Sequence, residues 1–286
     1  MGRRLSDRLH GRERTQVSLL LAGPIGWVGL AYLGSLAVLF VAAFWRLDTF
    51  TSQVVHDYGT QNFETIANSS TYRTIALRTI GIAAAVTVAD VILAFPIALY
   101  MAKVARPRVR NLMVVAVLMP LWSSYLVKVY AWRTILSTDG ILNWFLNPIG
   151  LHSPGFGNFA VFLVFTYLWL PYMVIPIYAG LERLPDSLLA ASGDLGAKPW
   201  TTIRRVVLPL VFPAVVAGSI FTFSLTLGDY ITPQIVSSTQ FIGNVVYSNV
   251  GVANNLPLAA AFGTVPVVVM IIYLLIARRL GAFEHV

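Results

Sequence analysis

Residues 184–209 of this chain read LPDSLLAASGDLGAKPWTTIRRVVLP, and they join two long apolar blocks. This stretch cannot itself cross a membrane, because it carries five charged side chains: Asp186, Asp194, Lys198, Arg204 and Arg205. Apolar residues Leu188, Ala191 and Leu195 nevertheless recur at i, i+3 and i+7, which indicates one apolar face of a short helix. The connection is therefore predicted to be folded.

The boundaries of two short helices can be predicted within this stretch. Ser187 is suited to cap the start of the first helix, and Gly196 is suited to end it in a left-handed conformation. Pro199 suits the first turn of a second helix, and we expect Leu208-Pro209 to close that helix at the membrane. The result is a helix, a sharp turn and a helix on one side of a membrane.

The rest of the chain has the composition of a membrane protein. It is 57% hydrophobic and 11% charged, whereas soluble domains carry about 25% charged residues. Six apolar blocks are each long enough to cross a hydrocarbon core of about 30 Å as a helix. They cover approximately residues 17–45, 75–102, 112–136, 159–181, 206–227 and 258–277. We expect an all-α membrane protein with about six transmembrane helices.

The distribution of positive charge predicts an orientation. Fifteen of the 20 Lys and Arg residues lie in the N-terminal segment, in the loops after the second and fourth blocks, and at the C-terminus. The positive-inside rule places these parts, including both termini, in the cytoplasm. Residues 1–16 are then a basic cytoplasmic tail, and residues 17–286 are the six-helix domain. The first block is longer than the core of a signal peptide, which predicts an uncleaved first span.

Several chemistries are excluded or disfavoured by composition. The chain has no cysteine, which excludes disulfides and thiolate metal sites. The four histidines, His10, His56, His152 and His285, are far apart and predict no metal site. A membrane-embedded enzyme would need clustered His, Asp or Glu on neighbouring spans, and none is evident, so no catalytic residue is predicted. The net charge of +8 comes from residues between apolar blocks, which favours an orientation signal over binding of nucleic acid.

The connection between the fourth and fifth blocks also resembles the EAA loop of ABC importer permeases. That loop reads Glu-Ala-Ala, three residues, Gly, nine residues, Ile, any residue and Leu-Pro, and it matches here at Gly196 and at Leu208-Pro209. The sequence departs from the pattern where Ala190, Ala191 and Ser192 stand in place of Glu-Ala-Ala. Either Asp194 partly replaces the missing glutamate, or a partner permease retains it.

Four other stretches occur in the order found in spermidine/putrescine-type permeases. They are residues 119–132 (MPLWSSYLVKVYAW), 170–178 (LPYMVIPIY), 227–233 (LGDYITP), and 242–244 (IGN) with 255–258 (NLPL). Together with the EAA-like loop, they identify the chain as similar to the permease subunit of a type I, binding-protein-dependent ABC importer. The resemblance implies that the solute is a polyamine and that the protein lies in a bacterial inner membrane.

This resemblance also implies a set of partners. A second permease subunit would complete the pathway, with a heterodimer expected and a homodimer left open, and an extracytoplasmic binding protein would deliver the solute. Two cytoplasmic ATPase subunits would bind ATP and Mg²⁺, because this chain has no Gly-x-x-x-x-Gly-Lys-Ser/Thr loop. The permease itself would be non-catalytic and without a cofactor. The residues expected to couple it to the ATPase are Ala190, Ala191, Asp194, Leu195, Gly196, Ala197, Lys198, Pro199, Leu208 and Pro209.

Polar and aromatic residues within the spans are candidates for the pathway or a gate. They are Trp122, Tyr125, Lys128, Trp132, Asp229, Tyr230 and Asp90. A charge inside a span costs about 2.5–3.5 kcal/mol, so each one needs a reason. Asp90 is expected to form a hydrogen bond between helices, with a pathway carboxylate as the alternative. Lys128 either reaches the headgroups, latches an outer gate or contacts the binding protein.

The aromatic candidates can hold ammonium groups through cation–π contacts or simply pack between helices. Asp229 beside Tyr230 suits a polyamine, and it equally suits a plain helix terminus. An ion-gradient-driven secondary transporter is the alternative function, and Asp90 would be its best support.

Overall fold

The computed structural model describes residues 13–48 and 50–279 of the chain. Five helical segments are long and apolar enough to cross a membrane: Leu20–Ala42, Ser70–Val104, Asn158–Glu182, Pro199–Gly228 and Leu256–Arg279. A bent pair of helices adds a sixth if it is counted as one span. The expected all-α fold with about six transmembrane helices is confirmed. Most of the predicted basic tail, and the chain after residue 279, lie outside the described residues.

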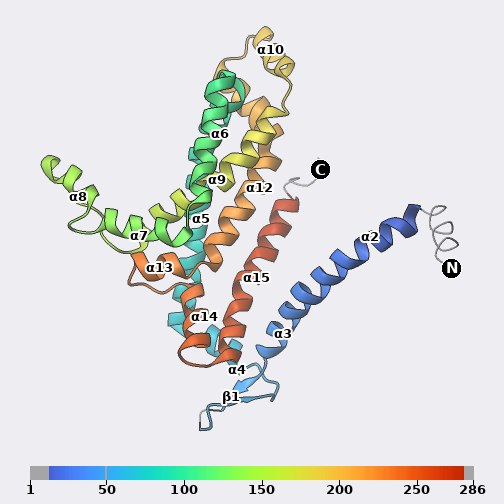
Figure 1. The fold of residues 1–286 in the computed structure, drawn as a ribbon, viewed down its shortest axis with the longest axis vertical. Helices are drawn as coiled ribbons and strands as arrows, with labels where there is room; N and C mark the ends of the chain where they lie inside the picture. The colour runs from blue at the N-terminus through green and yellow to red at the C-terminus, as the bar shows by residue number, and fades with distance from the viewer. Residues whose placement is uncertain (1–12, 49, 280–286) are drawn as a thin grey trace.

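Three helices form the centre of the bundle (Figure 1): α5 (Ser70–Leu99), α9 (Asn158–Glu182) and α12 (Leu208–Gly228). Lipid is as apolar as leucine, so helices in a membrane associate largely through close packing of small residues. A Cβ atom at Gly218 of α12 would lie 2.8 Å from the sulfur of Met173 on α9. One at Gly180 of α9 would lie 2.7 Å from the Cβ of Ala214. Glycine at these two positions allows α9 and α12 to approach each other closely.

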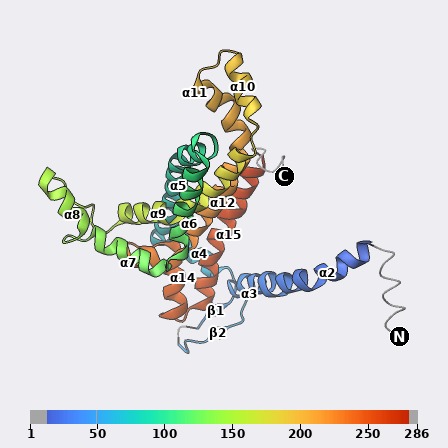
Figure 2. The same cartoon turned by 45° about the horizontal axis from the view of Figure 1, so that its top comes forward.

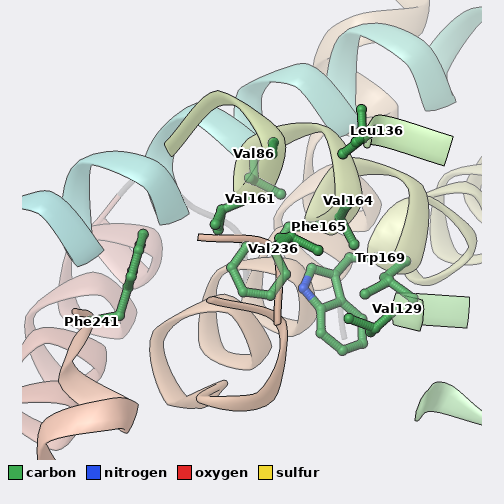
Figure 3. Close-up of a cluster of buried hydrophobic side chains, with 11 residues drawn as sticks. Val86, Val129, Leu136, Val161, Val164, Phe165, Trp169, Val236 and Phe241 are labelled. Carbon is green, nitrogen blue, oxygen red and sulfur yellow. The ribbon is translucent and has the colours of Figure 1, made fainter. Parts of the chain in front are cut away.

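Buried side chains form two main clusters, one toward each end of this centre. The first, drawn in Figure 3, includes Val86, Phe165, Trp169, Val236 and Phe241. The second includes Met101, Met173, Ile177, Leu181 and Val211. Each cluster supports one of the two ends of the bundle at which candidate functional residues lie.

The first membrane span departs from the bundle (Figures 1 and 2). It consists of α2 (Glu13–Trp27), the π-helix η1 (Val28–Leu33) and α3 (Gly34–Ala42). Only its α3 end packs on the body of the chain, where Ala42 and Ala43 meet Ala260 and Ala261 of α15 (Leu256–Arg279). Most of the other side chains described in this span are exposed within this single chain. α15 lies beside the central helices (Figure 1).

The third apolar block is not one straight helix, so the prediction of a continuous span over residues 112–136 is wrong. α6 (Pro107–Trp122) and α7 (Tyr125–Leu136) meet at a bend, and the two arms of the pair diverge by 94°. Ser123 and Ser124 adopt extended conformations between the helices. The amine of Lys128 donates to the carbonyl oxygen of Pro120 at 2.9 Å, and the Ser123 hydroxyl donates to the same oxygen at 2.9 Å. These bonds satisfy the end of α6 and hold the bend.

The long connections are folded, as their composition predicts. A hairpin of β1 (Arg46–Leu47) and β2 (Val54–Val55) precedes α4 (Gln61–Asn68). The chain beyond α7 forms α8 (Ile141–Leu146) and the short 3₁₀-helix η3 (Asn147–Ile149), which project sideways in Figure 1. α13 (Ile231–Val236) and α14 (Ile242–Gly251) lie between α12 and α15 in the sequence. At the opposite end of the bundle (Figure 1), residues 184–209 form the short helices α10 (Asp186–Asp194), α11 (Pro199–Thr202) and η4 (Ile203–Val207) and the start of α12.

Candidate functional site: the coupling segment and the outer cluster

The predicted coupling segment folds into a helix and a tight turn at one extremity of the molecule (Figure 1). α10 spans Asp186–Asp194, and Gly196 follows it with a φ of +74°. The Gly196 N–H donates to the Gly193 carbonyl at 2.8 Å, and the Ala197 N–H donates to the Ser192 carbonyl at 3.1 Å. These bonds close the last turn of the helix. The left-handed glycine predicted at residue 196 is confirmed.

Two details of the predicted segment are wrong. Pro185, not Ser187, precedes the first turn of α10, and no side chain caps that turn; the acidic Asp186 there suits the positive end of the helix dipole. Leu208-Pro209 does not close the second helix. α11 (Pro199–Thr202) continues through the π-helix η4 (Ile203–Val207) into α12, and the wider turn of η4 can absorb the proline, which removes a single backbone donor.

The apolar face predicted on α10 is turned outward. The exposed fractions are 41% for Leu188 and 89% for Leu195, and Trp200 on α11 is 68% exposed. Ala190 and Ala191 are exposed as well, whereas Ser192 is buried and its hydroxyl meets that of Thr202 at 2.8 Å. The hydroxyl pair holds α10 against α11 and so keeps these exposed apolar side chains in place.

The remaining candidates for coupling lie around the turn. Asp194 and Lys198 are exposed, and neither forms an ion pair with another described residue. Ala197 is half-buried, and Pro199 begins α11 as predicted. No carboxylate stands at residue 190, which agrees with the departure from the EAA pattern.

At the other end of the bundle, Tyr125 and Asp229 come together although 104 residues separate them. The Tyr125 hydroxyl donates a short hydrogen bond to the Asp229 carboxylate and lies 2.6 Å from the hydroxyl of Thr232. The Thr232 N–H donates to the other Asp229 oxygen at 3.0 Å. We call Tyr125, Asp229 and Thr232 the outer cluster. It joins α7 and α13 to the end of α12.

An aromatic stack leads from the outer cluster into the bundle. The Tyr125 ring lies 6.1 Å from the Trp169 ring at an interplanar angle of 13°, and Trp169 lies 6.0 Å from Tyr172. Tyr172 in turn lies 6.4 Å from Phe221 of α12. The indole N–H of Trp169 is buried and has no hydrogen-bond partner among the described residues. Sequence reasoning missed Trp169, because a tryptophan within an apolar run gives no sign of what it faces.

The other predicted pathway residues are not part of this cluster. The Tyr230 ring stacks on Tyr247 of α14 at 4.6 Å, and its carbonyl accepts a bond from Asn244. Trp122 is 91% exposed at the bend between α6 and α7. Trp132 lies 5.5 Å from Tyr167, while Lys128 is engaged with Pro120 as described above. Of the seven candidates, the structure joins only Tyr125 and Asp229 directly.

Asp90 lies apart, in the middle of α5. Its side chain is fully buried, and neither carboxylate oxygen has a hydrogen-bond partner within the described part of the chain. The hydrogen bond between helices that the sequence led us to expect is therefore not formed. Thr87, one turn earlier, donates to the Ala83 carbonyl of its own helix at 2.7 Å.

The described residues contain no group of three or more His, Cys, Asp or Glu side chains that could hold a metal ion. His56 packs edge-on against Trp45, and His152 meets the side chain of Asn147 at 3.1 Å. His10 and His285 lie outside residues 13–48 and 50–279.

A comparison with protein families places the chain. The profile of the binding-protein-dependent transport system inner membrane component matches residues 84–282. The chain belongs to this family. The matched residues include both the coupling segment and the outer cluster, and membership places the protein in a bacterial inner membrane as a multi-pass ABC transporter permease.

Curated relatives of this permease are similar over most of its length. It is 47% identical to the inner membrane ABC transporter permease protein YdcU of Escherichia coli K12, over 93% of this chain and 90% of YdcU. It is 28% identical to the spermidine/putrescine transport system permease protein PotB of the same organism, over 89% of this chain and 94% of PotB.

Solved structures show the same fold at low identity. A bacterial ABC transporter that imports the acidic polysaccharide alginate superposes with a TM-score of 0.67 at 20% identity, covering 96% of this chain and 99% of that one. The MetNI methionine ABC transporter, in an inward-facing conformation, gives a TM-score of 0.56 at 16% identity over 72% of this chain and 93% of that one. The predicted type I importer fold is confirmed.

Proposed function

We propose that this ABC importer permease subunit forms half of a translocation pathway for a polyamine. In this proposal, a second permease subunit completes the pathway and an extracytoplasmic binding protein delivers the solute. Two ATPase subunits bind ATP and Mg²⁺ and drive the cycle, and this chain takes no catalytic part. The partner permease is expected to be a different chain, which would supply the glutamate that is missing at Ala190.

The exposed apolar surface around Leu195 is the observation that carries the importer mechanism. Removing apolar area from water contributes about 25 cal/mol per Å², so Leu188, Leu195 and Trp200 would stabilise a complex with a protein groove. The tight turn at Gly196 and the bond between Ser192 and Thr202 keep α10 in one shape. A stiff helix of this kind can pass the movement of an ATPase to the spans as a rigid body. This requires residues 184–209 and both termini to lie in the cytoplasm, as the charge distribution predicts.

The outer cluster supports a cationic substrate. Asp229 provides a carboxylate at the end of α12, and the adjoining aromatic stack provides ring faces that attract ammonium groups. A polyamine carries several ammonium groups joined by short apolar chains, which matches an acid followed by aromatic rings. Two of the relatives' names point the same way, since PotB of Escherichia coli and of Haemophilus influenzae are named as spermidine/putrescine permeases.

Family membership disfavours an ion-gradient-driven secondary transporter. Asp90 is the residue that best supports that alternative, and it is buried outside the outer cluster with no hydrogen-bond partner among the residues that the structure describes.

Reconstitution tests the proposal. The permease would be placed in liposomes with its proposed partners, an ATPase, a second permease and a binding protein, and uptake of radiolabelled putrescine and spermidine would be followed with and without ATP. We expect uptake that requires both ATP and the binding protein. Uptake that ignores ATP would contradict the importer mechanism, and ATP-dependent uptake of an anionic or neutral solute in place of polyamines would contradict the substrate class.

A further inference from the structure

A single lysine connects the coupling segment to a helix that is not its neighbour in the sequence. The Lys103 amine donates to the Leu184 carbonyl at 2.6 Å and to the Asp186 carboxylate at 2.7 Å. Lys103 belongs to the π-helix η2 (Tyr100–Val104), which continues α5 at the end of the bundle that carries α10. Only 12% of its side chain is exposed, against 86% for Asp186. The lysine therefore reaches the connection from inside the bundle.

The two acceptors lie on either side of the bend between α9 and α10. Leu184 follows the end of α9, and Asp186 is the first residue of α10. One ammonium group thus fixes the angle between the two helices and attaches both to α5. Hydrogen bonds to charged groups are stronger than those between neutral groups, and they hold direction as well as distance.

Covalent connections cannot provide this link. α10 is joined through the chain to α9 on one side and, through the Gly196 turn and α11, to α12 on the other. α5 is reached only through space. Within residues 13–48 and 50–279, no other side chain of α5 or η2 forms a hydrogen bond to residues 183–194. Met101 and Leu184 also meet in a buried apolar cluster, but apolar packing is non-directional and allows sliding.

A second ion pair nearby is weaker. Arg110 of α6 lies 3.7 Å from Glu182 of α9, and both side chains are more exposed than Lys103, at 34% and 50%. Exposed pairs of this kind contribute little, because solvent and salt screen them. It also ends on α9 and does not touch α10, so it cannot report movement of the coupling helix directly.

We propose that Lys103 is a positioning residue that transmits displacement of α10 to α5. This inference rests on the proposed function, because it requires an ATPase to move α10. The result of the link is that α5, α9 and α12 move together when the coupling helix moves.

The test compares variants in the reconstituted complex by the amount of polyamine taken up per ATP hydrolysed. Lys103→Met should assemble with the ATPase and hydrolyse ATP, yet lose about tenfold in uptake per ATP. Lys103→Arg, which keeps the charge and the donors, should restore most of the ratio. Asp186→Asn should reduce it less, because the Leu184 carbonyl remains an acceptor. Arg108→Met is the matched control, since Arg108 lies five residues further along the chain, in the first turn of α6, and is exposed.

A distance measurement separates transmission from a merely structural role. The chain has no cysteine, so spin labels can be placed at exposed Val104 and Ser187 without background. The distance between them should stay constant between the nucleotide-free and ATP-trapped states of the unaltered protein, and it should change between these states in Lys103→Met. A distance that changes in the unaltered protein would overturn the inference.

The uptake assay distinguishes the possible failures. If the unaltered complex takes up polyamine with ATP and Lys103→Met behaves like Arg108→Met, the inference is wrong and the proposed function stands. If the unaltered complex shows no ATP-dependent uptake, both are wrong. If Lys103→Met does not assemble with the ATPase, the test rests on Asp186→Asn. An uptake per ATP equal to that of Arg108→Met would then overturn the inference.

Discussion

The two ends of the bundle are built in opposite ways. At the coupling end, large apolar side chains such as Leu195 are exposed, and polar groups such as Lys103 hold the chain in place from within. At the other end, the polar groups of the outer cluster are turned toward one another and lie against the aromatic stack. The first arrangement suits a surface that another protein covers, and the second suits a place where a charged solute exchanges partners with the protein.

The same three central helices support both ends of the bundle. α5, α9 and α12 carry one buried cluster behind each site, and the glycines that bring α9 and α12 together lie beside the second cluster, at Met173 and Val211. A movement that begins at α10 would therefore reach the outer cluster through packed helices. Substitutions at each end should separate the two roles.

The largest effect is expected at Leu195. Leu195→Asp places a charge where the ATPase groove should cover an apolar side chain, which removes about 1.5–3 kcal/mol of burial and adds the cost of desolvating a carboxylate. We expect binding of the ATPase to fall about a hundredfold or more, measured by co-purification and by titration in detergent. Leu151→Asp, also at an exposed leucine but beyond α8, is the control and should bind normally. If Leu195→Asp binds the ATPase normally, the exposed apolar residues around Leu195 are not where the ATPase binds.

A smaller loss is expected at the outer cluster. Asp229→Asn keeps the shape of the side chain and an acceptor for the Thr232 N–H, but it removes the charge that would meet an ammonium group. The loss of a charge-assisted contact predicts about a tenfold fall in polyamine uptake. ATPase binding should be unchanged, since the cluster lies at the opposite end of the bundle. Wild-type uptake by Asp229→Asn would show that the substrate does not meet this carboxylate.

Gly196 tests the shape of the coupling segment. Its φ of +74° is strained for any residue with a Cβ, although no atom lies within 4 Å of where that Cβ would stand. Gly196→Ala should cost about 1 kcal/mol in conformational energy, which corresponds to about a fivefold fall in uptake per ATP. Gly193→Ala is the matched control, because Gly193 is helical and a Cβ there also meets nothing. Equal behaviour of the two variants would show that the turn is not needed in this form.

The smallest effect is expected from Tyr125→Phe. The ring remains stacked on Trp169, but the hydroxyl that bonds to Asp229 is lost. Because the Tyr125 hydroxyl meets Asp229 and the carboxylate that would meet the substrate is retained, uptake should change by only a few-fold at saturating substrate. The apparent affinity for putrescine, measured in the same assay, should change by more than in a Trp122→Phe control. A loss of uptake larger than that of Asp229→Asn would show that Tyr125, and not Asp229, is the more important of the two residues for transport.

The sequence predicts the spans well where an apolar run ends at polar residues. The fourth block, expected at residues 159–181, is α9 at Asn158–Glu182, and the sixth, expected at 258–277, is α15 at Leu256–Arg279. The third block misled the prediction, because its apolar character continues through the bend after Pro120. That bend depends on a contact from Lys128, eight residues away, which periodicity does not reveal.

For the candidate site residues too, features set by the local sequence could be predicted, and features set by contacts between helices could not. The backbone conformation predicted for Gly196 and the helix start predicted at Pro199 are confirmed, because backbone preferences are local properties of those residues. Trp169 and Lys103 were missed, because their roles depend on which helices lie beside them. Asp229 was identified from its type and place, but its partner Tyr125 could not be assigned across 104 residues without the fold.

Cysteine labelling can show whether the segment around Leu195 faces the cytoplasm and is covered by the ATPase, since the chain has no native cysteine. Leu195→Cys would be exposed to a membrane-impermeant maleimide in right-side-out and in inside-out vesicles, with and without the ATPase. We expect Leu195→Cys to be labelled only in inside-out vesicles, and we expect bound ATPase to protect it from the maleimide. Labelling from the outside, or labelling that the ATPase leaves unchanged, would contradict it.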